Sequence, residues 1–216
     1  MQIGPPLEDR SRISFFEKGG NLPDSDRPGG PQDDEAKLLE ECRAGNVSAF
    51  EHLYEMHGAR MKSIAANLLG NLADAEDAVQ DCFLKVYRGA ASFRGASRLS
   101  TWIYRVLVNS CYDMLRKRRR YPLEARSEGE TLVSIREPVT PASDHPLRLS
   151  LEACVKDLEP RRRAAFLLFE VEGFTHREVG DILGVPEGTS KTLLFEARRE
   201  LQRLLARRGV VAAARS

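Results

Sequence analysis

Long apolar runs are absent from this chain of 216 residues. No stretch approaches the roughly 18 apolar residues that a membrane-spanning helix needs. The N-terminus also lacks the apolar core of a secretory signal peptide. These absences argue against a membrane or secreted protein, and they predict a cytoplasmic one.

Cysteine and histidine are scarce, with four residues of each. The cysteines lie far apart and form neither a Cys-x-x-Cys pair nor a Cys/His cluster with zinc-ligand spacing. We expect them to be reduced and partly buried, and we expect no cofactor. They are Cys42, Cys82, Cys111 and Cys154.

Regular apolar spacing is missing from three segments. Residues 1–32 hold five Gly and five Pro, and 121–146 hold four Pro. Neither segment has an apolar stripe that could offset the entropy of ordering it. We interpret 1–32 and 209–216 as flexible tails and 121–146 as a linker, which leaves two domains at 33–120 and 147–208.

Helical periodicity fills both predicted domains, and nothing in the sequence predicts a strand. The first domain shows helical patterns at 33–45, 47–70 and 74–90, and a fourth helix beginning near Ser100 as its N-cap. The second of these helices carries one apolar stripe with a minor polar intrusion, made of Phe50, Leu53, Tyr54, His57, Met61, Ile64 and Leu68. We therefore predict an all-α protein of two small helical domains.

The second domain carries the pattern of a helix-turn-helix. Two amphipathic helices are expected at 147–159 and 160–173, with Pro160 in a first turn. Thr175 and Glu178 then form a capping box, Gly184 permits a tight turn, and a longer helix starts around Pro186. A short helix, a Gly-containing turn and a longer helix are typical of DNA-binding domains.

The inner face of that longer helix is predicted to consist of Ser190, Leu194, Ala197, Leu201 and Leu204. Its opposite face suits a recognition helix in a major groove. That face displays Gly188, Lys191, Thr192, Phe195, Arg198 and Arg199.

The net charge of +1 hides a strongly basic segment from Phe93 to Arg120, which holds eight cations and a single anion, Asp113. Cations at a helix end are often only a solvated terminus favoured by the helix dipole. That explanation does not cover the rings of Trp102 and Tyr104, which follow Phe93 and Arg94 in a Gly-containing loop. Rings next to cations are the combination that stacks unpaired bases and holds a phosphate backbone.

Alternatives remain for individual residues of this segment. Trp102 could equally be a core residue. Asn109 is either a helix-surface amide or a hydrogen-bonding group for a base edge.

An acidic helix supplies a second candidate site. Asp77 and Asp81 stand one turn apart, next to Asp74 and Glu76. A metal-dependent hydrolase in a helical bundle would need a second carboxylate helix with a Glu-x-x-His motif, and this sequence has none. A solvated helix face or a protein-docking surface therefore explains the cluster better.

Three stretches together resemble the bacterial RNA polymerase sigma factors of the extracytoplasmic-function (ECF) group. They are "AEDAVQDCFLKVYR", "FRGASRLSTWIYRVLVNSCYDMLRKRRR" and "LEPRRRAAFLLFEVEGFTHREVGDILGVPEGTSK". The resemblance covers about 170 residues, and it implies a transcription initiation factor without catalytic activity of its own.

The resemblance also implies roles for individual residues. The acidic helix would dock on core RNA polymerase through Asp77, Gln80, Asp81 and Leu84. The −10 promoter element would be captured and melted by Phe93, Arg94, Ser100, Trp102, Arg105, Asn109, Arg116 and Lys117. The −35 element would be read by Thr175, Gly188, Thr189, Lys191, Thr192, Phe195, Arg198 and Arg199.

Physical chemistry agrees with a strand-opening role. Extruding a base costs a few kcal/mol, and stacking returns about 1–3 kcal/mol per base, so rings and cations belong together. As a free coil, the 26-residue linker would span only about 28 Å, against the roughly 70 Å between elements about 20 base pairs apart. It would therefore have to run stretched along the polymerase.

Two features of the sequence depart from the family. Leu193 and Glu196 stand where its recognition helix is often basic, and Ser190 stands where a small aliphatic residue is common. The expected partners are core RNA polymerase, promoter DNA and an anti-sigma factor. A stand-alone helix-turn-helix regulator is the alternative function.

Overall fold

The computed structural model of the protein describes residues 32–93, 95, 97–120 and 145–208, with side chains from Lys37 and, in the second half, from Ser150 onward. Arg94, both predicted tails and the predicted linker as far as residue 144 lie outside these described residues.

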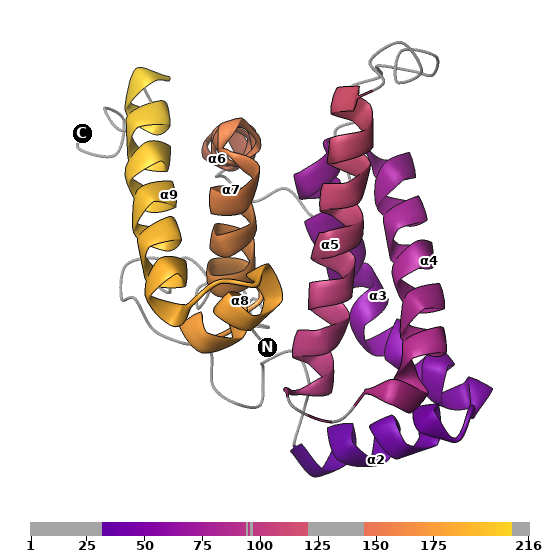
Figure 1. The fold of residues 1–216 in the computed structure, drawn as a ribbon. Helices are drawn as coiled ribbons and strands as arrows, with labels where there is room; N and C mark the ends of the chain where they lie inside the picture. Colours follow the sequence, from indigo (N-terminus) through magenta and orange to yellow (C-terminus); the bar gives the residue numbers. More distant parts are fainter. Residues whose placement is uncertain (1–31, 94, 96, 121–144, 209–216) are drawn as a thin grey trace, which may run out of the picture.

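Every regular element in the described ranges is helical, as predicted. Two groups of helices stand side by side in Figure 1, with α3, α4 and α5 in one, α2 across their end, and α6 to α9 in the other. The elements are α2 (Gln32–Arg43), α3 (Val47–Leu69), α4 (Leu72–Gly89), η2 (Ala90–Ser92), α5 (Leu99–Arg120), α6 (His145–Asp157), α7 (Pro160–Phe166), η4 (Leu167–Val171), α8 (His176–Leu183) and α9 (Glu187–Arg207).

Capping side chains set the beginnings of several helices. Asn46 accepts a hydrogen bond from the backbone N–H of Ser48 at 3.1 Å. Asn71 accepts one from the N–H of Asp74 at 2.8 Å. Each bond satisfies a first-turn amide that has no partner within its own helix. The two asparagines thus define the short connections from α2 to α3 and from α3 to α4.

The core of the first group lies between α3, α4 and α5. Leu53, Met61, Ile103 and Leu107 are all fully buried there. The predicted apolar stripe of α3 is correct at Leu53 and Met61 but wrong at Tyr54, which is exposed and packs its ring against Phe83 at 5.2 Å between centroids. Tyr54 lies at the edge of the stripe, where an aromatic ring is only half covered.

The helix-turn-helix forms as the sequence predicts. Thr175 and Glu178 make a reciprocal capping box at the start of α8. Gly184 ends α8 with φ of 66°, a left-handed conformation that favours glycine. On α9, the predicted inner residues Ser190, Leu194, Ala197 and Leu201 are buried, and Leu204 is partly buried.

Helix boundaries needed three corrections. The fourth helix of the first domain begins at Leu99, so Ser100 is a buried first-turn residue and not an N-cap. The helix expected at 160–173 changes after Phe166 into a wider π-helical turn, Leu167–Val171. The first helix of the second domain starts at His145, two residues inside the predicted linker.

The two groups share one continuous core. The ring of Tyr104 on α5 meets that of Phe174, just before α8, at 5.0 Å between centroids and an interplanar angle of 68°. Both side chains are buried, at 0% and 2% exposed.

None of the described helices is both long and apolar enough to span a membrane.

His57 is a buried titratable group in this core. Its ring meets Tyr104 edge-on at 6.0 Å, and burial, together with the positive charge of Arg60, lowers the pKa of His57 from 6.5 to about 4. The folded protein therefore holds His57 neutral where the unfolded chain would bind a proton.

We predict that the free energy of unfolding falls as the pH drops from about 6.5 to about 4. In this window the unfolded chain binds more protons, so the loss contributed by His57 amounts to up to about 3 kcal/mol. Chemical denaturation at a series of pH values measures it. The His57→Gln variant should show a flatter profile, and an identical slope in both proteins would contradict the prediction.

Candidate nucleic-acid interface

The four side chains predicted on the acidic helix form one exposed row. Asp77, Gln80, Asp81 and Leu84 are separated by three, one and three positions along α4, which places them on one helix face. All four are exposed, and Leu84 has 54% of its surface open to solvent. An exposed leucine between carboxylates suits a protein contact better than a solvated face.

A polar network connects this row with α5. The Lys85 ammonium lies 2.6 Å from Asp81 Oδ2 and donates to Ser110 Oγ at 2.9 Å, while Ser110 donates to Asp81 at 3.1 Å. The hydrogen bond from Lys85 lowers the pKa of Asp81, so its carboxylate stays ionised. Lys85 was not among the residues predicted for this site. Its only indication in the sequence is its position four residues after Asp81.

A groove between α4 and α5 brings two predicted sets together. It places the acidic row beside the basic end of α5, so one surface presents both signs of charge. Its lining residues are Asp77, Asp81, Lys85, Ser110, Asp113, Met114, Arg116, Lys117 and Arg120.

Of the three rings predicted to stack on bases, Phe93 and Trp102 stack on each other, whereas Tyr104 is fully buried in the core, where no base can reach it. Phe93 and Trp102 lie 4.7 Å apart between centroids with an interplanar angle of 18°. Arg43 of α2 donates to the Phe93 carbonyl, which holds the loop on the helices. Trp102 is partly buried against Gly89, so it lies at the edge of the core with part of its ring exposed.

The side chains of α5 differ in their accessibility. Asn109 is exposed. Arg105 is partly covered, because its Nε donates to the backbone carbonyl of Asp181 on α8 at 2.6 Å. Ser100 is fully buried. The structure therefore places Asn109, but neither Arg105 nor Ser100, on an open surface.

The basic end of α5 divides into structural and exposed cations. Arg118 forms an ion pair with Asp74 and donates to the Leu69 carbonyl at 3.1 Å, so it fastens α5 to the α3–α4 corner. Arg116 pairs with Asp113 one turn earlier and remains mostly exposed, and Lys117 is exposed as well. Arg119 and Arg120 are also exposed, so Arg116 and Lys117 belong to a group of four accessible cations at this helix end.

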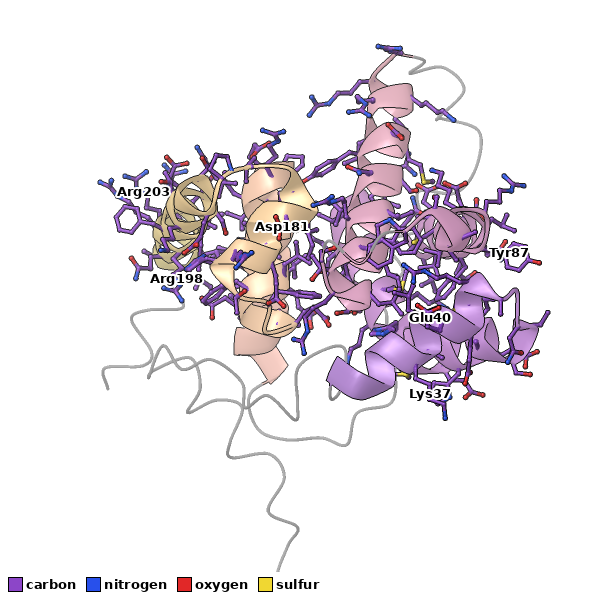
Figure 2. All side chains as sticks on the ribbon, turned by 60° about the horizontal axis from the view of Figure 1, so that its bottom comes forward. Lys37, Glu40, Tyr87, Asp181, Arg198 and Arg203 are labelled. Carbon is purple, nitrogen blue, oxygen red and sulfur yellow. The ribbon has the colours of Figure 1, made fainter. Side chains whose placement is uncertain are left out.

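The predicted outward face of α9 is exposed along its length. Phe195 has 65% of its surface in solvent, which is unusual for a phenylalanine. Figure 2 shows Arg198 and Arg203 on the side of α9 that faces away from α5. The exposed residues are Gly188, Thr189, Lys191, Thr192, Phe195, Arg198 and Arg199. Thr175, also predicted to contact DNA, is partly buried, and its side chain serves the capping box of α8.

Two cations of this face have intramolecular partners. Arg198 donates to Glu170 through Nε at 2.6 Å, and Lys191 lies 2.7 Å from Glu187 one turn before it. The Lys191–Glu187 pair is exposed at both partners, so it contributes little to stability and exchanges readily for a phosphate. The Glu170 side chain is only 8% exposed, so release of Arg198 would leave a nearly buried carboxylate without its partner.

The departures noted in the recognition helix have structural roles. Arg162 of α7 donates to Glu196 at 3.0 Å and to Glu200 at 2.8 Å, which fastens α7 to α9. Ser190 is buried because its hydroxyl shares a hydrogen bond of 3.2 Å with His176 Nδ1 of α8. The sequence analysis missed His176 because a single polar pair leaves no periodic signal.

The described ranges contain no group of three His, Cys, Asp or Glu side chains that could hold a metal ion. Lys85 pairs with Asp81, and Arg116, Lys117 and Arg120 line the same groove, so the cations beside these carboxylates oppose metal binding.

Comparison with known proteins matches both halves of the chain. Residues 53–121 match the family model of sigma-70 region 2, and residues 148–201 match that of sigma-70 region 4. The ECF RNA polymerase sigma factor SigM of Mycobacterium tuberculosis is 31% identical over 175 residues, covering 79% of this chain and 84% of its own. SigW of Bacillus subtilis is 28% identical over 179 residues, covering 78% and 95%.

A solved structure shows the same arrangement of helices. The sigma factor RpoE, in complex with the anti-sigma factor NepR from Bartonella quintana, is 25% identical and has a TM-score of 0.61. The match covers 74% of this chain and 98% of that one.

Close packing at Gly180 holds the helix-turn-helix together. A Cβ added there would lie 2.7 Å from the Val185 carbonyl oxygen, and the Val185 N–H donates to the Gly180 carbonyl at 2.9 Å. By contrast, a Cβ at Gly188, in the first turn of α9, would meet nothing within 4 Å.

We predict that Gly180→Ala lowers the free energy of unfolding by about 1–3 kcal/mol, because the turn must open to admit a methyl group. The matched variant Gly188→Ala should be neutral or more stable by up to about 1 kcal/mol, since alanine favours the helix. Thermal unfolding followed by circular dichroism compares them. Equal melting temperatures for the two variants would contradict the packing described for Gly180.

Proposed function

The chain belongs to the ECF RNA polymerase sigma factors, and we propose from its geometry that it binds core RNA polymerase through α4 and reads promoter DNA through α5 and α9. The exposed row Asp77, Gln80, Asp81 and Leu84 carries this proposal, because one face of one helix holds all four residues expected to dock.

The −10 element is assigned to the N-terminal end and the exposed edge of α5. The stacked pair Phe93 and Trp102 offers a preassembled flat surface, and a flipped base extends such a stack at about 1–3 kcal/mol per base. Asn109, Arg116 and Lys117 lie exposed along the same helix. Arg94, Ser100 and Arg105 complete the proposed set.

The −35 element is assigned to the outward face of α9. The helix presents Lys191, Thr192, Phe195 and Arg199 to solvent, and α7 and α8 hold it from behind. A rigid recognition helix loses little conformational entropy when it enters a major groove. More of the free energy of its DNA contacts therefore contributes to the binding affinity.

The remaining assignments follow from the family and the sequence. We propose functional domains at 33–120 and 147–208, no catalytic activity, and action in the cytoplasm, where the polymerase works. By analogy with the RpoE–NepR complex, an anti-sigma factor would control this protein.

We predict that Gln80→Ala/Asp81→Ala weakens binding to core RNA polymerase at least tenfold, because it removes two polar contacts from the centre of the α4 row. Gel filtration of the purified chain with bacterial core polymerase gives the first test, and a titration gives the affinity. Gln202→Ala/Asp157→Ala removes one amide and one carboxylate from exposed positions in the other domain and should bind normally.

Failure of the wild-type chain to elute with polymerase at low salt would instead favour a stand-alone helix-turn-helix regulator. Equal binding by the wild type and the α4 variant would remove α4 as the docking surface.

A separate prediction concerns phosphate contacts by α9. In complex with polymerase, Lys191→Ala and Arg199→Ala should each weaken promoter binding and reduce the slope of log K against log salt by about 0.9, as expected for one phosphate contact. Arg208→Ala, at the opposite end of α9, serves as the control. Slopes that match the wild type would show that Lys191 and Arg199 do not touch phosphates.

A further inference from the structure

Arg43, at the end of α2, holds one member of the stacked ring pair that is assigned to base capture. Its Nη2 donates to the backbone carbonyl of Phe93, and the Phe93 ring stacks on Trp102 at 4.7 Å between centroids. Helix α2 contacts both η2 and α5, and Figure 1 shows it crossing the end of the first helical group where α4 ends and α5 begins. A helix that carries none of the predicted site residues therefore touches the proposed base-capture site.

The bond from Arg43 completes the fixation of Phe93. This residue lies where the chain leaves η2 and becomes extended, with φ of −69° and ψ of 118°. Its N–H donates to the carbonyls of Gly89 and Ala90 at 3.1 and 3.3 Å. Arg43 supplies the partner of its carbonyl, so the N–H, the carbonyl and the ring of Phe93 are each held by a different contact. A residue fixed in this way loses little conformational entropy when a base stacks on it.

Trp102 is held from its own side of the pair. A Cβ added at Gly89 would lie 3.1 Å from Trp102 Cζ2, so the indole rests directly on the end of α4. The Trp102 N–H donates to the Arg98 carbonyl at 3.1 Å. The indole thus belongs to α4 and α5, whereas the carbonyl of Phe93, its partner in the stack, is held by α2.

The surroundings of Arg43 suit positioning better than a phosphate contact. Its Nη1 donates to Glu40 Oε1 one turn earlier, so its charge is paired, and its side chain is only 29% exposed. Leu39 and Cys42 anchor α2 in the core, at 9% and 3% exposed. Arg43 is therefore a fixed bracket on a fixed helix.

We propose that Arg43 is a positioning residue for base capture, and that α2 is a structural part of the −10 site because it holds Phe93 in register with Trp102. Helix α2 precedes residues 53–121, which match sigma-70 region 2. The role in base capture rests on the function proposed above, whereas the bond between Arg43 and Phe93 does not.

The first experiment tests the bond in the free chain. Trp102 is the single tryptophan of the protein, so the intrinsic fluorescence of this residue reports on the stacked pair. In Arg43→Ala, acrylamide should quench Trp102 more efficiently than in the wild type, and the quenching constant should move toward that of Phe93→Ala, which lacks the stack. A quenching constant equal to that of the wild type would overturn the anchoring of Phe93 by Arg43.

Arg88→Ala is the matched control, because it removes an exposed cation from the last turn of α4, directly before Gly89. It should leave the quenching constant unchanged. Alanine is a strong helix former, so Arg43→Ala should retain α2, and circular dichroism establishes that each variant is folded.

The second experiment measures base capture by the chain in complex with core polymerase. The probe is a partly single-stranded fragment of a promoter that this complex transcribes in vitro. An abasic site is introduced in turn at each unpaired position of the −10 element, and the captured base is the one whose removal weakens wild-type binding most. That loss should be at least about fivefold, which corresponds to the lower end of the stacking contribution of one base.

Arg43→Ala should bind the intact probe more weakly than the wild type, by about fivefold or more, and should lose little further affinity at the abasic position. Phe93→Ala should behave in the same way, and Arg88→Ala should behave like the wild type. The full abasic loss in Arg43→Ala would overturn the positioning role, because the base would then be captured without the bond.

The salt dependence of binding distinguishes positioning from direct contact. The slope of log K against log salt should be equal for Arg43→Ala and the wild type. A slope reduced by about 0.9 would make Arg43 a phosphate ligand and overturn the proposal. If the wild type forms no complex with polymerase, the proposed function is contradicted, and the fluorescence of the free chain still decides whether Arg43 holds Phe93.

Discussion

The Tyr104 side chain joins the two helical groups of this molecule through its ring and its hydroxyl. Its ring lies in the core of the first helical group, edge-on to His57, and it also packs against Phe174 of the second group. Its hydroxyl has no access to water and bonds to Glu172. A buried hydroxyl without a partner costs about 1–3 kcal/mol. If the two halves separate, the Tyr104 hydroxyl and the Glu172 carboxylate must therefore both become exposed to solvent. The same residue therefore stabilises one domain and fastens it to the other.

Arginine has different tasks in different parts of this chain, although its charge is constant. Arg118 and Arg162 hold helices together through carboxylates and a backbone carbonyl. Arg105 holds the domains together. Arg199 is exposed on the recognition face. A net charge near zero is consistent with this division, because much of the positive charge is neutralised inside the molecule and only selected positions remain for phosphates.

Local signals predicted the helices and turns well. The Thr175–Glu178 capping box, Gly184 and the buried stripe of α9 follow from spacing alone, because each depends on neighbours within one or two turns. Likewise, the exposed row on α4 follows from helical periodicity. The bond between Arg105 and Asp181 could not be predicted this way, since it joins residues 76 positions apart and its acceptor is a backbone carbonyl, which every residue possesses.

The sequence predicted which residues belong to the candidate site, but not how their side chains lie relative to one another. Phe93 and Trp102 were identified as rings next to cations, yet their mutual stacking depends on the path of the loop between η2 and α5. Ser100 was placed at a helix end, but one additional helical residue, Leu99, moves it into the core. Successive residues of a helix point about 100° apart, so neighbours such as Leu99 and Ser100 take positions that only the packing of the whole helix decides.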